Sequence, residues 1–295
     1  MNIAFCVNRL GLIGLGATVA SLIRNCSGPE SLSIYIFCAY VSDADKDIIS
    51  RLFEIENFAG EYKLIDFDPM YQFGSLRPLH GDWTPYGILL LPDFIEDREV
   101  LYLDSDLIVE LDVLQLFNFN FEDKALAAVP GGTVKTEYER DFYINKIGLS
   151  PDFASFNSGV VLFNLTEWRL NKLKDRCLEI AKRFPNDLLS ADQTLLNAVF
   201  AGNFSKLPAC YNCAWFAKDA EPELPGKAII HFIGSPKPWD LFGFLIHKGF
   251  STWKSYSNWL WEEKYIGASF LPNLKRTWNI RRSYVRVIKL RFSGN

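Results

Sequence analysis

A chain of 295 residues can form one large α/β domain or two small ones. Hydrophobic residues make up 49% of it and charged residues 22%, a composition that provides a substantial core and excludes a disordered chain. The net charge of −4 argues against a nucleic-acid-binding protein.

The charge is unevenly distributed along the chain. Seven of the 31 basic residues lie near the C-terminus, which leaves 24 against 35 acidic residues in the rest, and no acid follows Glu263. The seven alternate with apolar residues: Lys275, Arg276, Arg281, Arg282, Arg286, Lys289 and Arg291. We therefore expect a main domain over residues 1–264 and a basic amphipathic tail over 265–295 that anchors to a membrane surface. A solvated, partly ordered terminus is the alternative.

Cysteine usage and the N-terminus give weaker signals. Six cysteines are too few for a disulfide scaffold, and the single CxxC of Cys210 and Cys213 favours two ordinary cysteines over a metal or redox site. The apolar run 10–23 resembles a signal-peptide core, but it contains three glycines and is too short to cross a bilayer. We therefore expect a cytoplasmic protein whose first strand begins at Ile3.

Strands and helices alternate along the chain. Strands are expected at 3–7, 32–40, 62–67, 100–103, 125–129, 159–164 and 228–233, with a short apolar continuation at 107–109. Helices are expected at 16–24, 43–56 (capped by Ser42 or Asp43), 166–184 and 192–200. This alternation predicts an α/β fold with a Rossmann-like, doubly wound, mostly parallel sheet. No internal repeat or Ser/Gly linker divides the chain, which favours a single domain.

The segment YLDSDLIV, residues 102–109, places two acids at i and i+2 directly after an apolar strand. Burying an unpaired carboxylate is costly, and two close together repel. A hard divalent cation removes both penalties, because it binds carboxylate oxygens and supplies the opposite charge. Asp104 and Asp106 are therefore candidate metal ligands, with a polar turn after an edge strand as the alternative.

The segment HFIGSPKPW, residues 231–239, also follows a predicted strand. His231 offers an imidazole ligand, Gly234 allows close approach of the backbone to a phosphate, and Lys237 supplies a positive charge. Two prolines stiffen the loop that carries these groups. A surface loop with a histidine by chance is the alternative.

The segments FNSGVVLFN and SADQTLLN carry neutral polar groups. Asn157 and Ser158 offer hydrogen bonds of the kind that bind sugar hydroxyls. Asp192 and Gln193 stand in the first turn of a predicted helix, where the dipole and free amides favour a polar ligand. For Asp192 alone, a capping role is the simpler alternative.

Together, these four segments follow the order and approximate spacing of glycosyltransferase family 8, and the resemblance covers roughly residues 1–240. The family includes bacterial lipopolysaccharide galactosyl- and glucosyltransferases and, more distantly, glycogenin. The resemblance implies a GT-A fold, a UDP-sugar donor, Mn²⁺ (with Mg²⁺ possible) and transfer with retention of configuration. It also implies a hexose of glucose or galactose type and a glycan or glycolipid acceptor, such as a lipopolysaccharide or capsule precursor. With the basic tail, it implies a cytoplasmic protein peripheral to the inner face of the membrane.

The resemblance also implies roles for particular residues. The implied metal ligands are Asp104, Asp106 and His231. The implied donor contacts are Cys6, Asn8, Tyr86, Ser105, Asn157, Ser158, Gly234 and Lys237. The implied catalytic residues, beneath the donor sugar, are Asp192 and Gln193. Same-face attack and a covalent intermediate on Asp192 both remain open as routes to retention. Candidate acceptor segments are 133–146 and 253–261, although aromatic residues there more often serve packing.

Two positions depart from the family pattern. The family has an acid in the loop after the first strand, where it holds the uracil, but this chain has Asn8. The family has a basic residue two positions after a tyrosine, but Ile88 follows Tyr86 at that spacing. These changes favour, as the main alternative, a nucleotide-sugar or glycan binding protein on a degenerate transferase fold. A dinucleotide-binding oxidoreductase is a weaker alternative, because its GxGxxxA match at Gly14 begins seven residues after the first strand.

Overall fold

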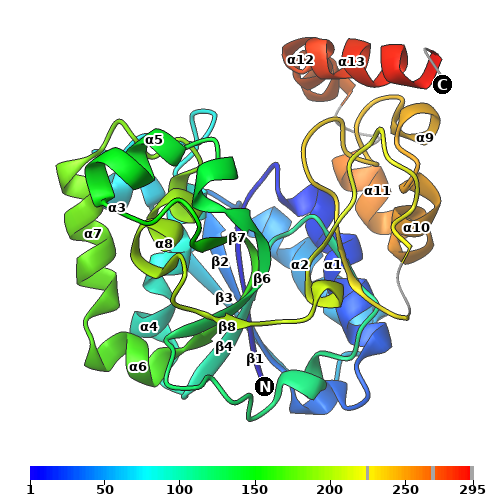
Figure 1. Cartoon of the computed structure of the whole chain (residues 1–295). Helices are drawn as coiled ribbons and strands as arrows, with labels where there is room; N and C mark the ends of the chain where they lie inside the picture. Colours follow the sequence, from blue (N-terminus) through cyan, green and yellow to red (C-terminus); the bar gives the residue numbers. More distant parts are fainter. Residues whose placement is uncertain (224–225, 267–269, 293–295) are drawn as a thin grey trace.

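The structure is a computed structural model that describes residues 1–223, 226–266 and 270–292. Its centre is a seven-stranded sheet in the order β3-β2-β1-β4-β7-β6-β8 (Figure 1). The strands are β1 Asn2–Asn8, β2 Ser33–Ala39, β3 Glu61–Phe67, β4 Glu99–Leu103, β6 Leu126–Thr133, β7 Ala154–Asn164 and β8 Ser205–Lys206. Strands β3, β2, β1 and β4 are parallel, whereas β7 is antiparallel to both β4 and β6. The predicted α/β class with a mostly parallel sheet is confirmed.

Helices cover both faces of this sheet because the strand residues are apolar on both sides. In β1, for example, Ile3 and Phe5 pack into one core and Ala4 into the other. The first core is covered by α1 Leu12–Asn25, α2 Asp43–Ile55 and α11 Trp259–Tyr265. The second is covered by α3 Pro69–Phe73, the 3₁₀ helix η2 Thr84–Leu90, α4 Leu91–Phe94, α6 Leu165–Leu170, α7 Leu173–Arg183 and α8 Ala191–Phe200.

A smaller three-stranded sheet lies beside the main one. It has the order β5-β10-β9, formed by β5 Leu107–Val109, β10 Ile229–His231 and β9 Cys213–Ala214. The C-terminal part adds α9 Gly243–Ile246, α10 Phe250–Tyr256, α12 Phe270–Asn279 and α13 Arg281–Phe292 (Figure 1). Short connecting helices are η1 Pro29–Ser31, η3 Val113–Leu116, η4 Val134–Thr136, α5 Arg140–Phe142, η5 Tyr143–Ile147 and η6 Ala209–Tyr211.

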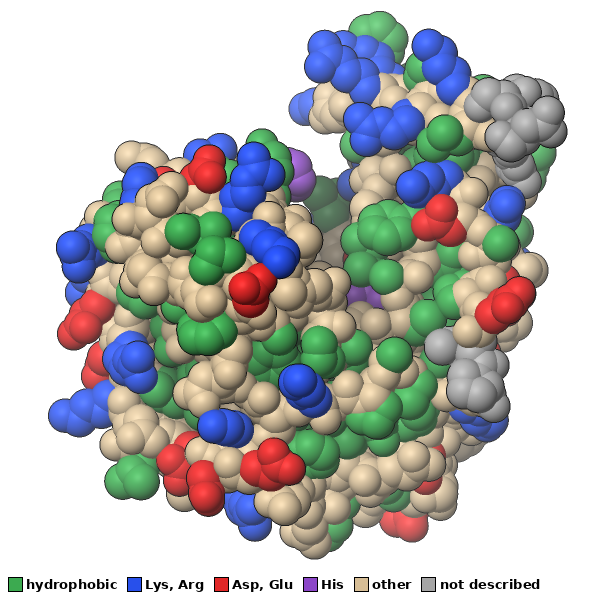
Figure 2. Space-filling view, viewed as in Figure 1, with side chains coloured by type: hydrophobic (Ala, Val, Ile, Leu, Met, Phe, Trp, Pro, Cys, Tyr) green, Lys and Arg blue, Asp and Glu red, His purple; other side chains and the backbone are tan. Residues whose placement is uncertain are grey.

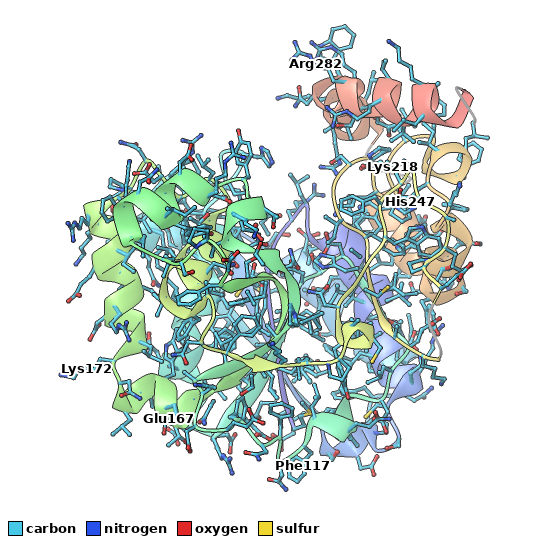
Figure 3. All side chains as sticks on the ribbon, in the orientation of Figure 1. Phe117, Glu167, Lys172, Lys218, His247 and Arg282 are labelled. Carbon is cyan, nitrogen blue, oxygen red and sulfur yellow. The ribbon has the colours of Figure 1, made fainter. Side chains whose placement is uncertain are left out.

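Most predicted elements lie within a few residues of the observed ones, with three differences. The helix predicted over 166–184 is two helices, α6 and α7, because the chain breaks at Lys172, where φ is +50° (Figure 3). Helix α1 begins at Leu12, four residues before its predicted start, and most of the apolar run 10–23 is buried within it. Strand β7 begins at Ala154, five residues before its predicted start.

The described part of the basic tail forms α12 and α13, and α13 packs on the rest of the chain. Tyr284 and Val287 of α13 are buried against Ala217 and Ile246. The division at residue 265 stays a prediction, and the side chains of Arg291 and Phe292 lie outside the described residues. Among the described residues, no helix combines the length and the apolar character needed to cross a membrane.

Candidate active site

The predicted motifs meet where the strand order reverses. Strand β1 pairs with β2 on one side and with β4 on the other, and all three are parallel. Loops that leave the carboxyl ends of such strands diverge, and this opening is where open α/β sheets bind ligands. Asp104 follows the last residue of β4 at this edge. Figure 2 shows the molecular surface hollowed between the lobe of α3 and α5 and the C-terminal helices.

Asp104, Asp106 and His231 form one cluster. One ligand atom from each lies within 4.8 Å of the others. Nε2 of His231 lies 3.2 Å from Oδ1 of Asp106 and 3.8 Å from Oδ2 of Asp104. The antiparallel pairing of β5 with β10 brings His231 opposite Leu107, next to Asp106 in the chain.

The donor set of this cluster fits a divalent metal. Nδ1 of His231 lies 3.0 Å from Oδ1 of Asn212. Because that oxygen can only accept, Nδ1 donates to it, and Nε2 faces the two carboxylates. Oδ1 of Asp106 is buried, and no hydrogen bond of ordinary geometry reaches it. Two carboxylates and an imidazole nitrogen that face one another at these distances are ligand types that a divalent cation binds.

Burial and neighbouring charges shift the pKa values of Asp104 and Asp106 in opposite directions. Burial and repulsion by Asp106 raise the pKa of Asp104. Burial would also raise the pKa of Asp106, but the positive charge of Lys237 and contact with His231 outweigh it and lower this pKa. Nζ of Lys237 lies 2.6 Å from Oδ2 of Asp106, and Oδ1 of Asp104 accepts a 2.9 Å hydrogen bond from the Tyr102 hydroxyl.

Gly159 permits this close packing. Its carbonyl accepts a 2.8 Å hydrogen bond from the amide of Asp104. A Cβ atom at Gly159 would lie 2.3 Å from Cε1 of His231 and 2.8 Å from Oδ2 of Asp104. Neither distance is tolerable, so a side chain here would displace the cluster.

Asn157, Ser158 and Gln193 form a hydrogen-bonded group beside the cluster. Oε1 of Gln193 accepts from Nδ2 of Asn157 at 2.9 Å and from the amide of Ser158 at 3.4 Å. Oδ1 of Asn157 accepts from Nδ2 of Asn212 at 3.1 Å, which joins this group to His231. Asn212 lies inside the CxxC segment and is missed by the sequence analysis, because nothing in the local pattern separates it from a loop asparagine.

Asp192 lies at the start of α8 and is 6% exposed. Burial, with repulsion by Asp104, raises its pKa to about 7, although a hydrogen bond from Ser158 acts in the opposite direction. A carboxyl with a pKa near neutrality changes its charge under ordinary conditions, which is typical of acids at functional sites.

Asn8 lies at the end of β1, and its polar atoms are already used. Oδ1 accepts from the amides of Leu10 and Gly11 at 2.8 and 3.0 Å, and Nδ2 donates to Oδ2 of Asp82 at 2.7 Å. Asp82, just before η2, was not singled out by the sequence analysis. The pair shows that a carboxylate lies beside this loop even though the loop itself has no acid.

The side chains of other predicted donor contacts are largely buried. The Tyr86 side chain is fully buried, and its hydroxyl donates to the Arg77 carbonyl at 2.7 Å. Ile88 is buried in the same core, so no charge replaces the family's basic residue at that position. Cys6 lies at the edge of that core, where burial, with a smaller effect of Asp192, raises the pKa of its thiol.

The glycine pattern of α1 serves packing. A Cβ atom at Gly14 would lie 2.3 Å from the carbonyl oxygen of Ser105 and 2.8 Å from the Trp239 ring. The glycine therefore lets α1 approach the turn between Asp104 and Asp106, which explains the GxGxxxA match without a dinucleotide.

Gly234 lies in the loop after β10. It has φ of +79°, so this loop needs a residue without a side chain.

Of the two candidate acceptor segments, 253–261 has mainly a packing role. Trp253 and Trp261 are buried, and the Trp261 indole donates to the Leu12 carbonyl at 2.7 Å. Segment 133–146 leaves Tyr138 83% exposed.

The mixed sheet, with an Asp-Ser-Asp turn after β4 and a histidine returning from a later strand, defines a GT-A type glycosyltransferase fold. The family model for glycosyl transferase family 8 matches residues 2–242. The chain therefore belongs to glycosyltransferase family 8, as predicted.

Similar proteins support this assignment. The chain is 25% identical over 274 residues to the lipopolysaccharide 1,3-galactosyltransferase of Salmonella typhimurium, covering 88% of this chain and 79% of that protein. It is 29% identical over 187 residues to the probable glycosyl transferase Gly of Streptococcus gordonii, covering 61% of this chain but only 25% of that protein. The crystal structure of the galactosyltransferase LgtC in complex with donor and acceptor sugar analogues has a TM-score of 0.72 at 22% identity, covering 87% of this chain and 95% of LgtC. This last likeness shows the fold.

Proposed function

We propose that this glycosyltransferase moves a hexose of glucose or galactose type, with retention, from a UDP-sugar to a glycan or glycolipid acceptor, and that it depends on Mn²⁺. The observation that carries the proposal is the cluster of Asp104, Asp106 and His231 beside Lys237. Two carboxylates with an imidazole nitrogen suit a divalent metal, and the adjacent ammonium suits a diphosphate. Mg²⁺ is the second candidate, because its ligand preferences are similar.

Transfer requires the diphosphate to leave. A bound divalent ion would supply positive charge that stabilises the diphosphate as a leaving group. Lys237 would contact the same diphosphate, because its ammonium already lies at the edge of the metal site, 2.6 Å from Asp106. Gly234 would let the backbone of this loop approach the phosphates.

The sugar would lie over α8. Gln193 is oriented by Asn157 and Ser158, since both donate to its side-chain oxygen, and its amide nitrogen is then directed elsewhere. That nitrogen is a hydrogen-bond donor, which suits a sugar hydroxyl rather than the positive charge of an oxocarbenium-like transition state. Same-face attack, in which the leaving phosphate takes the acceptor proton, and a covalent intermediate on Asp192 are both routes to retention that this arrangement allows.

The direct test is release of UDP from UDP-glucose, UDP-galactose and their N-acetylated forms, with Mn²⁺ and with a chelator. We expect Mn²⁺-dependent hydrolysis of at least one donor. UDP binding without hydrolysis of any donor would favour the alternative, a nucleotide-sugar binding protein, which the buried Ile88 in place of a basic residue motivates. Absence of both binding and hydrolysis would contradict the proposal.

We further propose that the C-terminal helices bind an anionic membrane surface. Lys and Arg side chains gather over α12 and α13, and Arg282 points away from the rest of the chain (Figures 2 and 3). Between the basic residues, Trp278 is 68% exposed. The buried side of α13 packs on Ala217 and Ile246, so only the outer side is available to lipid.

Replacing Trp278, Arg282 and Lys289 by serine is expected to weaken binding to vesicles of 30% phosphatidylglycerol at least about 10-fold, since each basic residue near such a surface contributes about 1 kcal/mol. UDP-sugar hydrolysis should not change. A matched control replaces one exposed aromatic and two exposed basic residues elsewhere: Phe117, Arg51 and Lys182. Cosedimentation measures binding, and equal losses in the two triple variants would contradict the proposal.

A further inference from the structure

The loop that carries Lys237 has little regular structure of its own. It runs from the end of β10 at His231 to the start of α9 at Gly243. An ammonium on such a loop holds one position only if other parts of the molecule fix the backbone. The indole of Trp239 packs against Gly14 of α1, which fixes one side of the loop.

Asp240 fixes the other side. Its Oδ2 accepts a 2.7 Å hydrogen bond from the backbone amide of Lys237, and its side chain is 3% exposed. The same carboxylate receives two bonds from Arg276 of α12, Nε to Oδ1 at 2.5 Å and Nη2 to Oδ2 at 3.1 Å. A buried carboxylate needs such a partner, because without it the charge would be left unpaired away from water.

Helix α13 contacts the residues that come after Asp240 in the chain. The Tyr284 hydroxyl donates to the carbonyl of Leu241 at 2.5 Å, and the Tyr284 ring packs on Ile246 of α9. The C-terminal helices therefore contact the loop directly after Lys237 at two separate points. A continuous path runs from Arg276 through Asp240 and Lys237 to Asp106.

We propose that Arg276 and Asp240 are positioning residues for Lys237, so that docking of α12 sets the affinity of the site for the donor diphosphate. The inference rests on the proposed role of Lys237 as a diphosphate contact. In this arrangement the C-terminal helices contribute to donor binding, in addition to the membrane binding proposed above. The pair acts through the loop backbone and touches neither donor nor metal.

The test compares Arg276→Gln, Arg276→Lys and Asp240→Asn with the wild type. Arg276→Gln is expected to raise the Kd for UDP and the KM for the UDP-sugar about 10-fold and to change kcat less, because a displaced Lys237 weakens the diphosphate contact. Arg276→Lys should recover part of the loss, since it restores the charge but only one of the two bonds. Hydrogen exchange of the amides in 232–242, measured without donor or metal, should be faster in Arg276→Gln and Asp240→Asn.

The matched control is Arg24→Gln. Arg24 makes an equally bidentate pair with Glu56, at 2.7 Å for both bonds, between α1 and the end of α2. This variant should keep the wild-type Kd and KM and the exchange rates of 232–242. Wild-type values in both Arg276→Gln and Asp240→Asn would overturn the positioning role. If the wild type itself binds no UDP with Mn²⁺, the proposed function fails, whereas the exchange rates still decide whether the pair holds the loop.

Discussion

Replacing Asp104 by asparagine is expected to abolish Mn²⁺-dependent turnover, with a loss of at least about 100-fold in kcat/KM. The change keeps the size of the side chain and an oxygen for the Tyr102 hydroxyl, which lies 2.9 Å from Oδ1. It removes one of the two negative charges that attract the metal. Release of UDP measures turnover, and paramagnetic resonance of free Mn²⁺ measures metal affinity.

Melting temperatures show whether the loss of turnover in Asp104→Asn comes from a lost metal site or from misfolding. Burial and repulsion by Asp106 raise the pKa of Asp104, so the ionised carboxylate destabilises the metal-free protein. With a chelator present, Asp104→Asn should therefore melt at the wild-type temperature or above it. Added Mn²⁺ should raise the melting temperature of the wild type and not that of the variant, because only bound ligand stabilises the folded state.

The control is Asp152→Asn, at an exposed acid that pairs with exposed Lys135 and lies outside the cluster. Exposed pairs contribute little to stability, so this variant should match the wild type in turnover and melting. Normal turnover and Mn²⁺ affinity in Asp104→Asn would refute the metal assignment.

The sequence indicates the metal cluster because each member lies at the end of a strand or within three residues of it. Asp104 comes directly after β4, and His231 is the last residue of β10. Alternation of strands and helices predicts that strand ends meet at one edge, so polar residues at those positions are brought together without knowledge of any contact. Asn157 lies within β7 and Asp192 in the first turn of α8, so strand ends do not place them, and their predicted roles came from the family resemblance.

Asn212, Asp82 and Asp240 could not be predicted in this way. Each acts through hydrogen bonds to a residue in another segment: Asn212 to His231, Asp82 to Asn8, and Asp240 to Arg276. Single polar residues in loops carry no periodicity, and the register of two loops depends on packing of the whole chain. The break at Lys172 has a similar origin, because the residues around it are compatible with a continuous helix.

The C-terminal tail shows another structural feature that its sequence pattern could not predict. Its alternation of basic and apolar residues predicts an amphipathic helix, and α13 is one. The pattern alone cannot say whether the apolar side faces lipid or protein. Tyr284 and Val287 face Ala217 and Ile246, so part of that side serves the fold.

Replacing Asp192 by asparagine is the second substitution with a large expected effect. Ionised Asp192 lies close enough to Asp104 to repel it, and the pKa of Asp192 is about 7 against an ordinary value near 3.8. Because the folded protein binds this proton more tightly than the unfolded chain, Asp192 lowers stability as the pH rises from about 4 to 7. The full penalty is present above pH 7 and absent near pH 4, and its upper limit is about 4 kcal/mol.

In metal-free protein, Asp192→Asn should therefore gain stability relative to the wild type as the pH rises from 5 to 8. Urea unfolding of both proteins at several pH values measures the difference in their free energies of unfolding. Groups that titrate alike in the two proteins cancel in this difference. Added Mn²⁺ should move the transition to lower pH, because a nearby cation favours the ionised carboxylate. Turnover should fall about 100-fold in the variant if the carboxylate contacts the sugar. A stability difference that does not change with pH would contradict the raised pKa, and wild-type turnover would remove Asp192 from the catalytic residues.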